Sequence, residues 1–130
     1  MKKLLIIEDD EPLCWLLERI LNGKYESIIM QNGLDALSWL SANPLPDLII
    51  SDLNMPSLDG IELLENVQTS GILRNIPVII LSGSEDPEKR KKCLDLGASS
   101  YLIKPFEPQL LLKEIEDTFK RVEKPLAINR

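Results

Sequence analysis

The sequence contains no histidine, only two cysteines and few aromatic residues (5%). The absence of histidine excludes a histidine base, a histidine metal ligand and a histidine phosphate carrier within these 130 residues. Cys14 and Cys93 match no metal-binding or redox spacing, and each lies among apolar residues. We therefore expect both to be buried free thiols. No apolar run approaches the length that spans a membrane.

Basic residues are also fewer than acidic residues. The chain has 15 Lys and Arg against 21 Asp and Glu, a net charge of −6, whereas nucleic-acid binding needs a dominant positive field. The apolar start at Leu4–Ile7 stops at Glu8, too early for a secretory signal. With 44% hydrophobic and 28% charged residues, the chain can bury a core of one domain. We expect a soluble cytoplasmic protein that contacts neither nucleic acid nor membrane directly.

Short apolar runs alternate with amphipathic segments five times along the chain. The predicted strands are Leu4–Ile7, Tyr25–Met30, Leu48–Ile50, Pro77–Leu81 and Tyr101–Ile103. Helices are predicted to start near Pro12, Asn32, Asp59, Pro87 and Pro108, the last ending at Phe119. This alternation predicts a doubly wound α/β fold, with a parallel sheet and helices on both faces. We assign residues 1–121 to the domain and residues 122–130 to a C-terminal tail or the start of a linker.

Polar side chains stand where four of the predicted strands end. The residues are Glu8 and Asp9 after the first strand, Asp52 after the third, Ser82 after the fourth and Lys104 after the fifth. In a parallel sheet, the carboxyl ends of all strands lie at one edge, and ligands bind there. We therefore expect these side chains to gather in one cluster. Asp10 and Glu11, in contrast, are predicted only to cap the first helix.

The residue types in this cluster predict phosphoryl-transfer chemistry. Two like charges about 4 Å apart repel by roughly 4 kcal/mol at an effective dielectric near 20. Three carboxylates in one crevice are therefore unfavourable unless cations join them or some of them stay protonated. Lys104 supplies one positive charge, and the oxygen ligands suit Mg²⁺, with Mn²⁺ as the alternative. Asp52 is the candidate nucleophile, Lys104 and the metal would neutralise phosphoryl oxygens, and Ser82 would hydrogen-bond one of them.

Several short segments carry a resemblance to a known family. They are Ile6–Glu11, Leu48–Pro56, Leu58–Gly60, Ile80–Gly83 and Gly97–Phe106. Together and in this order, they resemble the receiver domain of two-component response regulators, of the stand-alone single-domain type. The resemblance covers roughly the first 120 residues and implies a flavodoxin-like sheet of five parallel strands in the order 2-1-3-4-5.

The resemblance implies a role for each matching residue. Asp52 would be the phosphoacceptor, and Lys104 would pair first with its carboxylate and then with its phosphoryl group. Mg²⁺ would be bound by Asp9, Asp52 and the backbone carbonyl of Asn54, and by Glu8 through water. Ser82 and Tyr101 would form the switch pair, and the Lys104–Pro105 bond is often cis in this family.

The resemblance also implies how the domain works and with what. A sensor histidine kinase or phosphotransfer protein would donate the phosphoryl group, and slow self-hydrolysis would remove it. The chain would therefore be a signalling switch and no enzyme beyond its own modification. A downstream protein would bind the face formed by the helix from Pro87, strand Tyr101–Ile103 and the helix from Pro108. A phosphorylation-dependent dimer and onward phosphotransfer would be alternative outputs.

Two other functions fit parts of the sequence. Phosphatases with an Asp nucleophile share the fold and the Mg²⁺, but they place Asp-x-Asp after the first strand, whereas Asp52–Asn54 follows the third. A binding module that is never phosphorylated would not need the intact cluster.

Trp15 and Trp39 lie off the apolar stripes, and we expect half-buried rings rather than docking sites. The basic run Glu88–Lys92 is expected to be a solvated helix face, with an acidic protein partner as the alternative.

Overall fold

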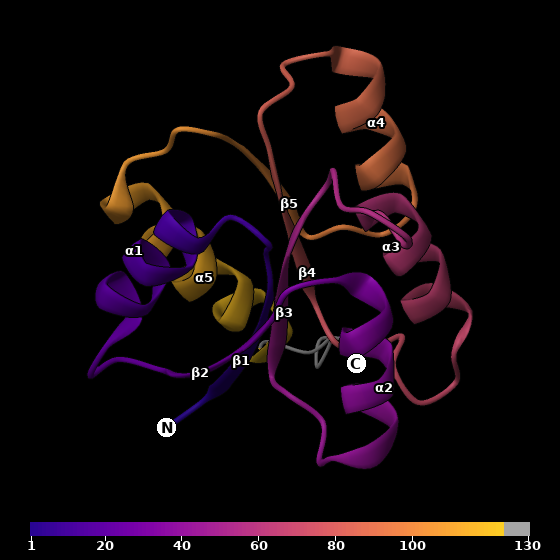
Figure 1. The fold of residues 1–130 in the computed structure, drawn as a ribbon, viewed down its shortest axis with the longest axis horizontal. Coiled ribbons are helices and arrows are strands. Elements are labelled where there is room, and N and C mark those ends of the chain that lie inside the picture. The colour runs from indigo at the N-terminus through magenta and orange to yellow at the C-terminus, as the bar shows by residue number, and fades with distance from the viewer. Residues whose placement is uncertain (124–130) are drawn as a thin grey trace, which may run out of the picture.

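The computed structural model describes residues 1–123 as one sheet covered by helices on both faces (Figure 1). Its elements, in chain order, are β1 (Lys3–Ile7), α1 (Glu11–Leu21), β2 (Glu26–Met30), α2 (Gly33–Ala42), β3 (Leu48–Asp52), α3 (Gly60–Thr69), β4 (Val78–Ser82), α4 (Pro87–Asp95), β5 (Ser100–Ile103) and α5 (Pro108–Glu123). The strands are parallel and run in the order β2-β1-β3-β4-β5, which confirms the predicted fold.

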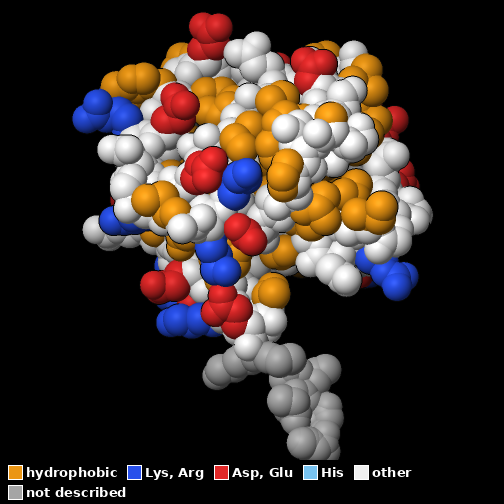
Figure 2. Space-filling view, turned by 90° about the horizontal axis from the view of Figure 1, so that it is seen from below, with side chains coloured by type: hydrophobic (Ala, Val, Ile, Leu, Met, Phe, Trp, Pro, Cys, Tyr) orange, Lys and Arg blue, Asp and Glu red, His pale blue; other side chains and the backbone are white. Residues whose placement is uncertain are grey.

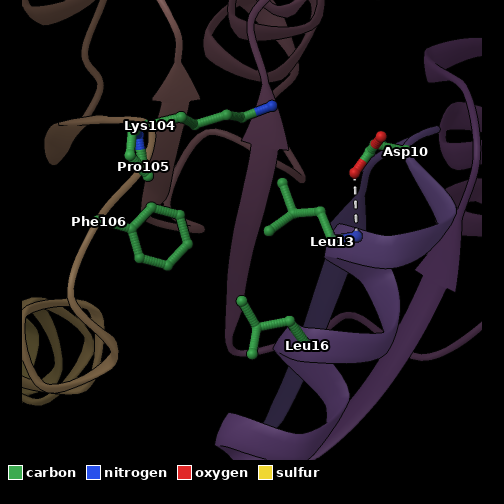
Figure 3. Close-up of a pocket in the computed structure, with 6 residues that line it drawn as sticks. All are labelled: Asp10, Leu13, Leu16, Lys104, Pro105 and Phe106. Carbon is green, nitrogen blue, oxygen red and sulfur yellow. Dashed lines mark hydrogen bonds between the residues drawn. The ribbon is translucent and has the colours of Figure 1, made fainter.

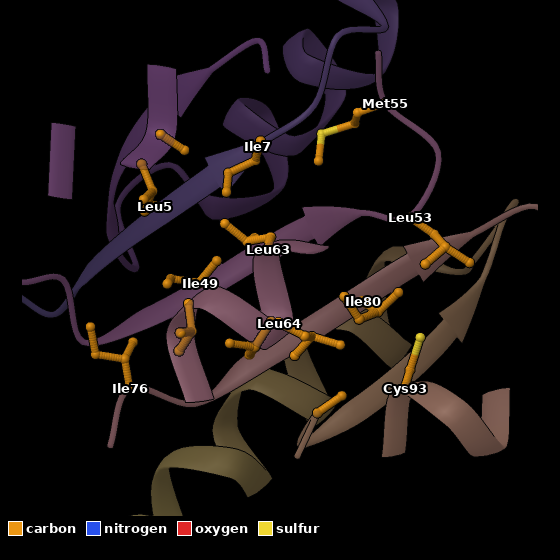
Figure 4. Packing of buried hydrophobic residues seen from close by; sticks show 14 of the residues in the cluster. Leu5, Ile7, Ile49, Leu53, Met55, Leu63, Leu64, Ile76, Ile80 and Cys93 are labelled. Atoms are coloured by element: carbon orange, nitrogen blue, oxygen red, sulfur yellow. The ribbon is translucent and has the colours of Figure 1, made fainter. Parts of the chain in front are cut away.

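The three central strands are apolar on both sides because each side meets a layer of helices. Leu5 and Ile7 of β1 pack into one cluster with α2, α3 and α4, which is shown in Figure 4. Leu4 and Ile6 point the other way, into a second cluster with α1 and α5. This alternation, repeated in β3 and β4, explains why the strands appear in the sequence as continuous apolar runs.

Helix boundaries follow local signals. Asp10 caps α1, Asn32 caps α2, and Asp86 caps α4 directly before Pro87. Asp59 forms a capping box with Glu62 at the start of α3. α5 continues to Glu123, beyond the predicted end at Phe119, and residues 124–130 of the predicted tail lie outside the described part of the chain.

The surface carries both signs of charge. On the face in Figure 2, basic and acidic side chains are interspersed between hydrophobic patches. The basic run of α4, Lys89–Lys92, is exposed, as expected for a solvated helix face. None of the helices within residues 1–123 is both long enough and apolar enough to cross a membrane.

Candidate phosphoryl-transfer site

Four strand ends meet at one edge of the sheet, as the sequence predicts. Glu8 directly follows β1, Asp52 ends β3, Ser82 ends β4 and Lys104 directly follows β5. The parallel register pairs Ile7 with Ser51 and Asp52 with Leu81, so these ends lie level with one another. Residues up to 96 positions apart in the chain are thereby brought into direct contact.

Three carboxylates form the acidic part of the site. Glu8, Asp9 and Asp52 each offer an oxygen, and these oxygens lie within 4.8 Å of one another. Glu8 is only 1% exposed and Asp52 6%, whereas Asp9 is exposed to solvent. Such a set of hard oxygen donors, open to water on one side, fits Mg²⁺ or Mn²⁺.

Lys104 supplies the positive charge of the site. Its Nζ donates hydrogen bonds to Asp52 Oδ1 at 2.9 Å and to Glu8 Oε1 at 3.1 Å. The side chain is 24% exposed, so the ammonium is shielded on most sides. One cation thus faces three carboxylates, and the net negative charge that remains favours a divalent cation.

The electrostatics of the cluster shift the pKa of two groups. Burial raises the pKa of Glu8, and the neighbouring Asp52 charge raises it further, although the hydrogen bond from Lys104 opposes both. For Lys104, burial acts to lower the pKa, but the hydrogen bonds to Asp52 and Glu8, together with the charges of these two carboxylates, outweigh burial and raise it. The ammonium therefore stays charged at neutral pH.

Ser82 and Tyr101 are joined through a residue that the sequence analysis did not single out. Ser82 is buried, and its Oγ accepts a hydrogen bond from the Ser84 N–H at 3.0 Å. The Tyr101 hydroxyl donates to the Ser84 carbonyl at 3.0 Å, and Tyr101 is 4% exposed. Ser84 joins Ser82 and Tyr101 through its backbone N–H and carbonyl, which every non-proline residue carries. The identity of its side chain therefore did not mark this position in the sequence.

The loop after β3 passes very close to the start of α3. The Gly60 N–H donates to the Leu53 carbonyl at 2.8 Å, and a Cβ at Gly60 would lie 2.7 Å from the Asp52 carbonyl oxygen. Only glycine permits this approach. Asn54 lies in the same loop with an exposed side chain, and metal binding by its carbonyl stays a prediction. The Lys104–Pro105 peptide bond is cis, as the resemblance implies.

Other expectations have mixed outcomes. Asp10 accepts a hydrogen bond from the Leu13 N–H and acts as a helix cap, as predicted. Cys14 and Cys93 are buried free thiols. Trp39 is half-buried, but Trp15 is 60% exposed beneath the Arg19 guanidinium, so the half-buried expectation was wrong for Trp15.

An apolar groove adjoins the site (Figure 3). It encloses about 350 Å³ between α1 and the β5–α5 loop. Its lining residues are Asp10, Leu13, Leu16, Lys104, Pro105 and Phe106. Leu13 and Leu16 of α1 face Phe106 across it, and Leu16 is exposed. Leu16 therefore extends the apolar surface of α1 beyond the residues that are buried in the core.

Comparison with known proteins agrees with this geometry. The response regulator receiver domain family matches residues 4–116. The phosphate regulon transcriptional regulatory protein PhoB of Escherichia coli is 30% identical over 131 residues, covering 98% of this chain and 55% of PhoB. The chain therefore spans about half the length of the curated relatives it matches.

Solved structures are similar over nearly the whole chain. The signal receiver domain of a histidine kinase from Syntrophus aciditrophicus is 32% identical, with a TM-score of 0.87, covering 100% of this chain and 98% of that one. The receiver domain of sensor histidine kinase PA1611 from Pseudomonas aeruginosa is 25% identical, with a TM-score of 0.80, covering 89% and 95%. That structure has a magnesium ion coordinated in its active-site cleft.

The flavodoxin-like sheet, with three carboxylates and a lysine at its carboxyl edge, defines an α/β domain of the kind found in signalling receiver domains. This chain belongs to the response regulator receiver domain family of two-component systems.

Proposed function

We propose that this domain is a phosphorylation switch in which Asp52 accepts a phosphoryl group from a phosphohistidine of a sensor histidine kinase or phosphotransfer protein. The observation that carries the proposal is the position of the Asp52 carboxylate. It ends the central strand, lies 2.9 Å from a lysine ammonium and adjoins two further carboxylates. A carboxylate with a purely structural role, such as a helix cap, would not need a lysine and two further carboxylates beside it.

In the proposed reaction, an oxygen of Asp52 attacks the phosphorus atom. A P–O bond forms, the P–N bond to the donor imidazole breaks, and the imidazole leaves with the bonding electrons and takes up a proton. Lys104 binds Oδ1 at 2.9 Å, so its ammonium lies beside the incoming phosphoryl group and neutralises part of its charge. The Ser82 Oγ accepts a hydrogen bond from the Ser84 N–H, which leaves the hydroxyl proton of Ser82 free, and this proton would be donated to a phosphoryl oxygen.

A divalent cation is part of the proposal. Asp9 and Asp52 would hold Mg²⁺ directly together with the Asn54 carbonyl, and the buried Glu8 would hold it through water. When bound, Mg²⁺ would neutralise charge on the phosphoryl oxygens. The three clustered carboxylates and the magnesium in the related Pseudomonas aeruginosa receiver domain support this assignment.

The apolar groove between α1 and the β5–α5 loop is the proposed docking site of the phosphodonor. Leu13, Leu16 and Phe106 offer apolar area directly beside Lys104 (Figure 3). A donor helix that packs its apolar side against Leu16 would place a histidine on its flank near Asp52. Truncation of Leu16 to alanine should therefore slow transfer from a protein donor, but not from a small phosphodonor.

Output is proposed to pass through Ser82 and Tyr101 to the face formed by α4, β5 and α5. The phosphoryl group would draw the Ser82 hydroxyl toward itself, and the Ser84 backbone would transmit the change to Tyr101. A downstream protein or a second phosphorylated copy would bind the altered face. Hydrolysis of the aspartyl phosphate then regenerates the carboxylate, so the domain catalyses only its own modification.

Intact-mass spectrometry after incubation with acetyl phosphate and Mg²⁺ tests the proposal. We expect one added phosphoryl group in the wild type, and none in Asp52→Asn or in the presence of EDTA. An adduct in Asp52→Asn would refute Asp52 as the acceptor. If no adduct forms, beryllofluoride provides the second measurement, and the absence of any change in tryptophan fluorescence would refute the switch.

A further inference from the structure

The position of Tyr101 is fixed at more than one point. Its hydroxyl is bound by the Ser84 carbonyl, on the β4–α4 loop. One residue of a second element, α4, lies near both the backbone carbonyl and the ring of Tyr101. This residue is Arg90, whose Nη1 donates to the Tyr101 carbonyl oxygen at 3.3 Å.

The Arg90 guanidinium also lies over the aromatic ring. Its central carbon is 5.9 Å from the Tyr101 ring centroid, at the outer limit of a cation–π contact. Arg90 belongs to the exposed basic run of α4, and its neighbours Lys89 and Lys91 are also exposed. Lys91 pairs with Asp95 on its own helix, so Arg90 differs from these neighbours in reaching across to β5.

We infer that Arg90 is a positioning residue that holds the Tyr101 ring in its buried orientation. The guanidinium lies on the α4 side of the ring, 5.9 Å from its centroid, and its hydrogen bond ties α4 to the backbone of β5. Arg90 thereby favours the inward ring before any phosphoryl group is present. The consequence for signalling rests on the proposed function, because it assumes that Tyr101 reports phosphorylation at Asp52.

Fluorine NMR on protein labelled with 3-fluorotyrosine can test this inference. The chain has two tyrosines, Tyr25 and Tyr101, so two resonances are expected, and Tyr101→Phe assigns them. A neutral gadolinium chelate in solution broadens the signal of an exposed ring. In unphosphorylated Arg90→Met, we expect this broadening to increase several-fold at Tyr101 and to remain unchanged at Tyr25.

Matched variants separate positioning from a general change in α4. Lys89→Met makes the same charge change one residue away and should leave the Tyr101 signal as in the wild type. Arg90→Lys keeps a cation near the ring and should give intermediate broadening. If Arg90→Met and Lys89→Met broaden Tyr101 equally, or neither does, the inference is wrong.

Beryllofluoride distinguishes this inference from the proposed function. With Mg²⁺ and beryllofluoride, we expect the Tyr101 ring of Arg90→Met to return to its protected state. If Arg90→Met exposes the ring but beryllofluoride alters Tyr101 in neither protein, the positioning role stands and the proposed coupling to Asp52 fails. If beryllofluoride protects Tyr101 but Arg90→Met never exposes it, the coupling stands and the positioning role fails.

Discussion

Substitution of Lys104 by methionine would remove the ammonium that, within residues 1–123, joins Glu8 and Asp52. Its Nζ lies 3.1 Å from one carboxylate and 2.9 Å from the other. At an effective dielectric of 20, each attraction is about 5 kcal/mol, but desolvation of the ammonium offsets much of that. For a lysine that is 24% exposed, we expect Lys104→Met to lower the free energy of unfolding by about 2–3 kcal/mol.

The loss should depend on pH with a definite sign. In the wild type, burial and the Asp52 charge raise the pKa of Glu8 above its ordinary value of 4.5. At pH values between the unfolded and the folded pKa, the folded state therefore binds more protons than the unfolded state. Stability contributed by Glu8 therefore falls as pH rises from about 4.5 through its folded pKa. Removal of Lys104 raises the pKa of Glu8 further. The deficit of the variant should thus be small near pH 4.5 and largest at neutral pH.

Urea denaturation in EDTA, followed by circular dichroism, measures this deficit. With a slope of about 1.5–2 kcal/mol per molar urea, the midpoint should fall by about 1–2 M at pH 7. Lys113→Met is the matched control, since Lys113 bonds Asp117 at 2.8 Å on the exposed side of α5. Because water screens this exposed pair, Lys113→Met should leave the urea midpoint nearly unchanged at any pH. Equal losses in both variants, or a deficit for Lys104→Met that does not change with pH, would refute the reasoning.

Three further predictions concern the loop after β3, the first residue of α3 and the metal. Ser57 has φ of 70°, so Ser57→Gly should raise the free energy of unfolding by about 0.5 kcal/mol in urea titrations, and a loss would contradict the strain argument. Gly60→Ala should lower it by about 3 kcal/mol, because its Cβ would lie 2.7 Å from a backbone oxygen, whereas Gly71→Ala, with open space, should change it little. At about 100 times its dissociation constant, Mg²⁺ should stabilise the fold by about 2.7 kcal/mol in thermal melts. Asp9→Asn should abolish most of this stabilisation and Asp10→Asn should keep it; equal effects of the two variants would place the metal elsewhere.

The fold was predictable because each local signal agreed with the others. Continuous aliphatic runs predicted buried parallel strands, and capping residues such as Asp59 and Asp86 fixed the helix starts. Boundaries differ by a few residues, as at β4, which begins at Val78 rather than Pro77. Proline has no N–H to donate to a sheet, which explains that difference.

The candidate site was predictable to the level of which residues meet, because parallel strands bring their carboxyl ends to one edge. The second partner of Lys104 was not predictable, since the contact with Glu8 depends on side-chain conformations across the sheet. The roles of Ser84 and Arg90 were also missed. One acts through its backbone, and the other stands in a basic run in which sequence does not distinguish Arg90 from its neighbours.

The central claim is that the phosphoryl group is carried by the Asp52 carboxylate, and borohydride trapping tests it most directly. Borohydride reduces an acyl phosphate to an alcohol and leaves a free carboxylate unchanged, so it converts only the phosphorylated aspartate into homoserine. After incubation with acetyl phosphate and Mg²⁺, digestion and peptide sequencing by mass spectrometry, we expect homoserine at position 52 alone. Homoserine at position 9 or 10, or a phosphoryl adduct that yields no homoserine at position 52, would contradict the account.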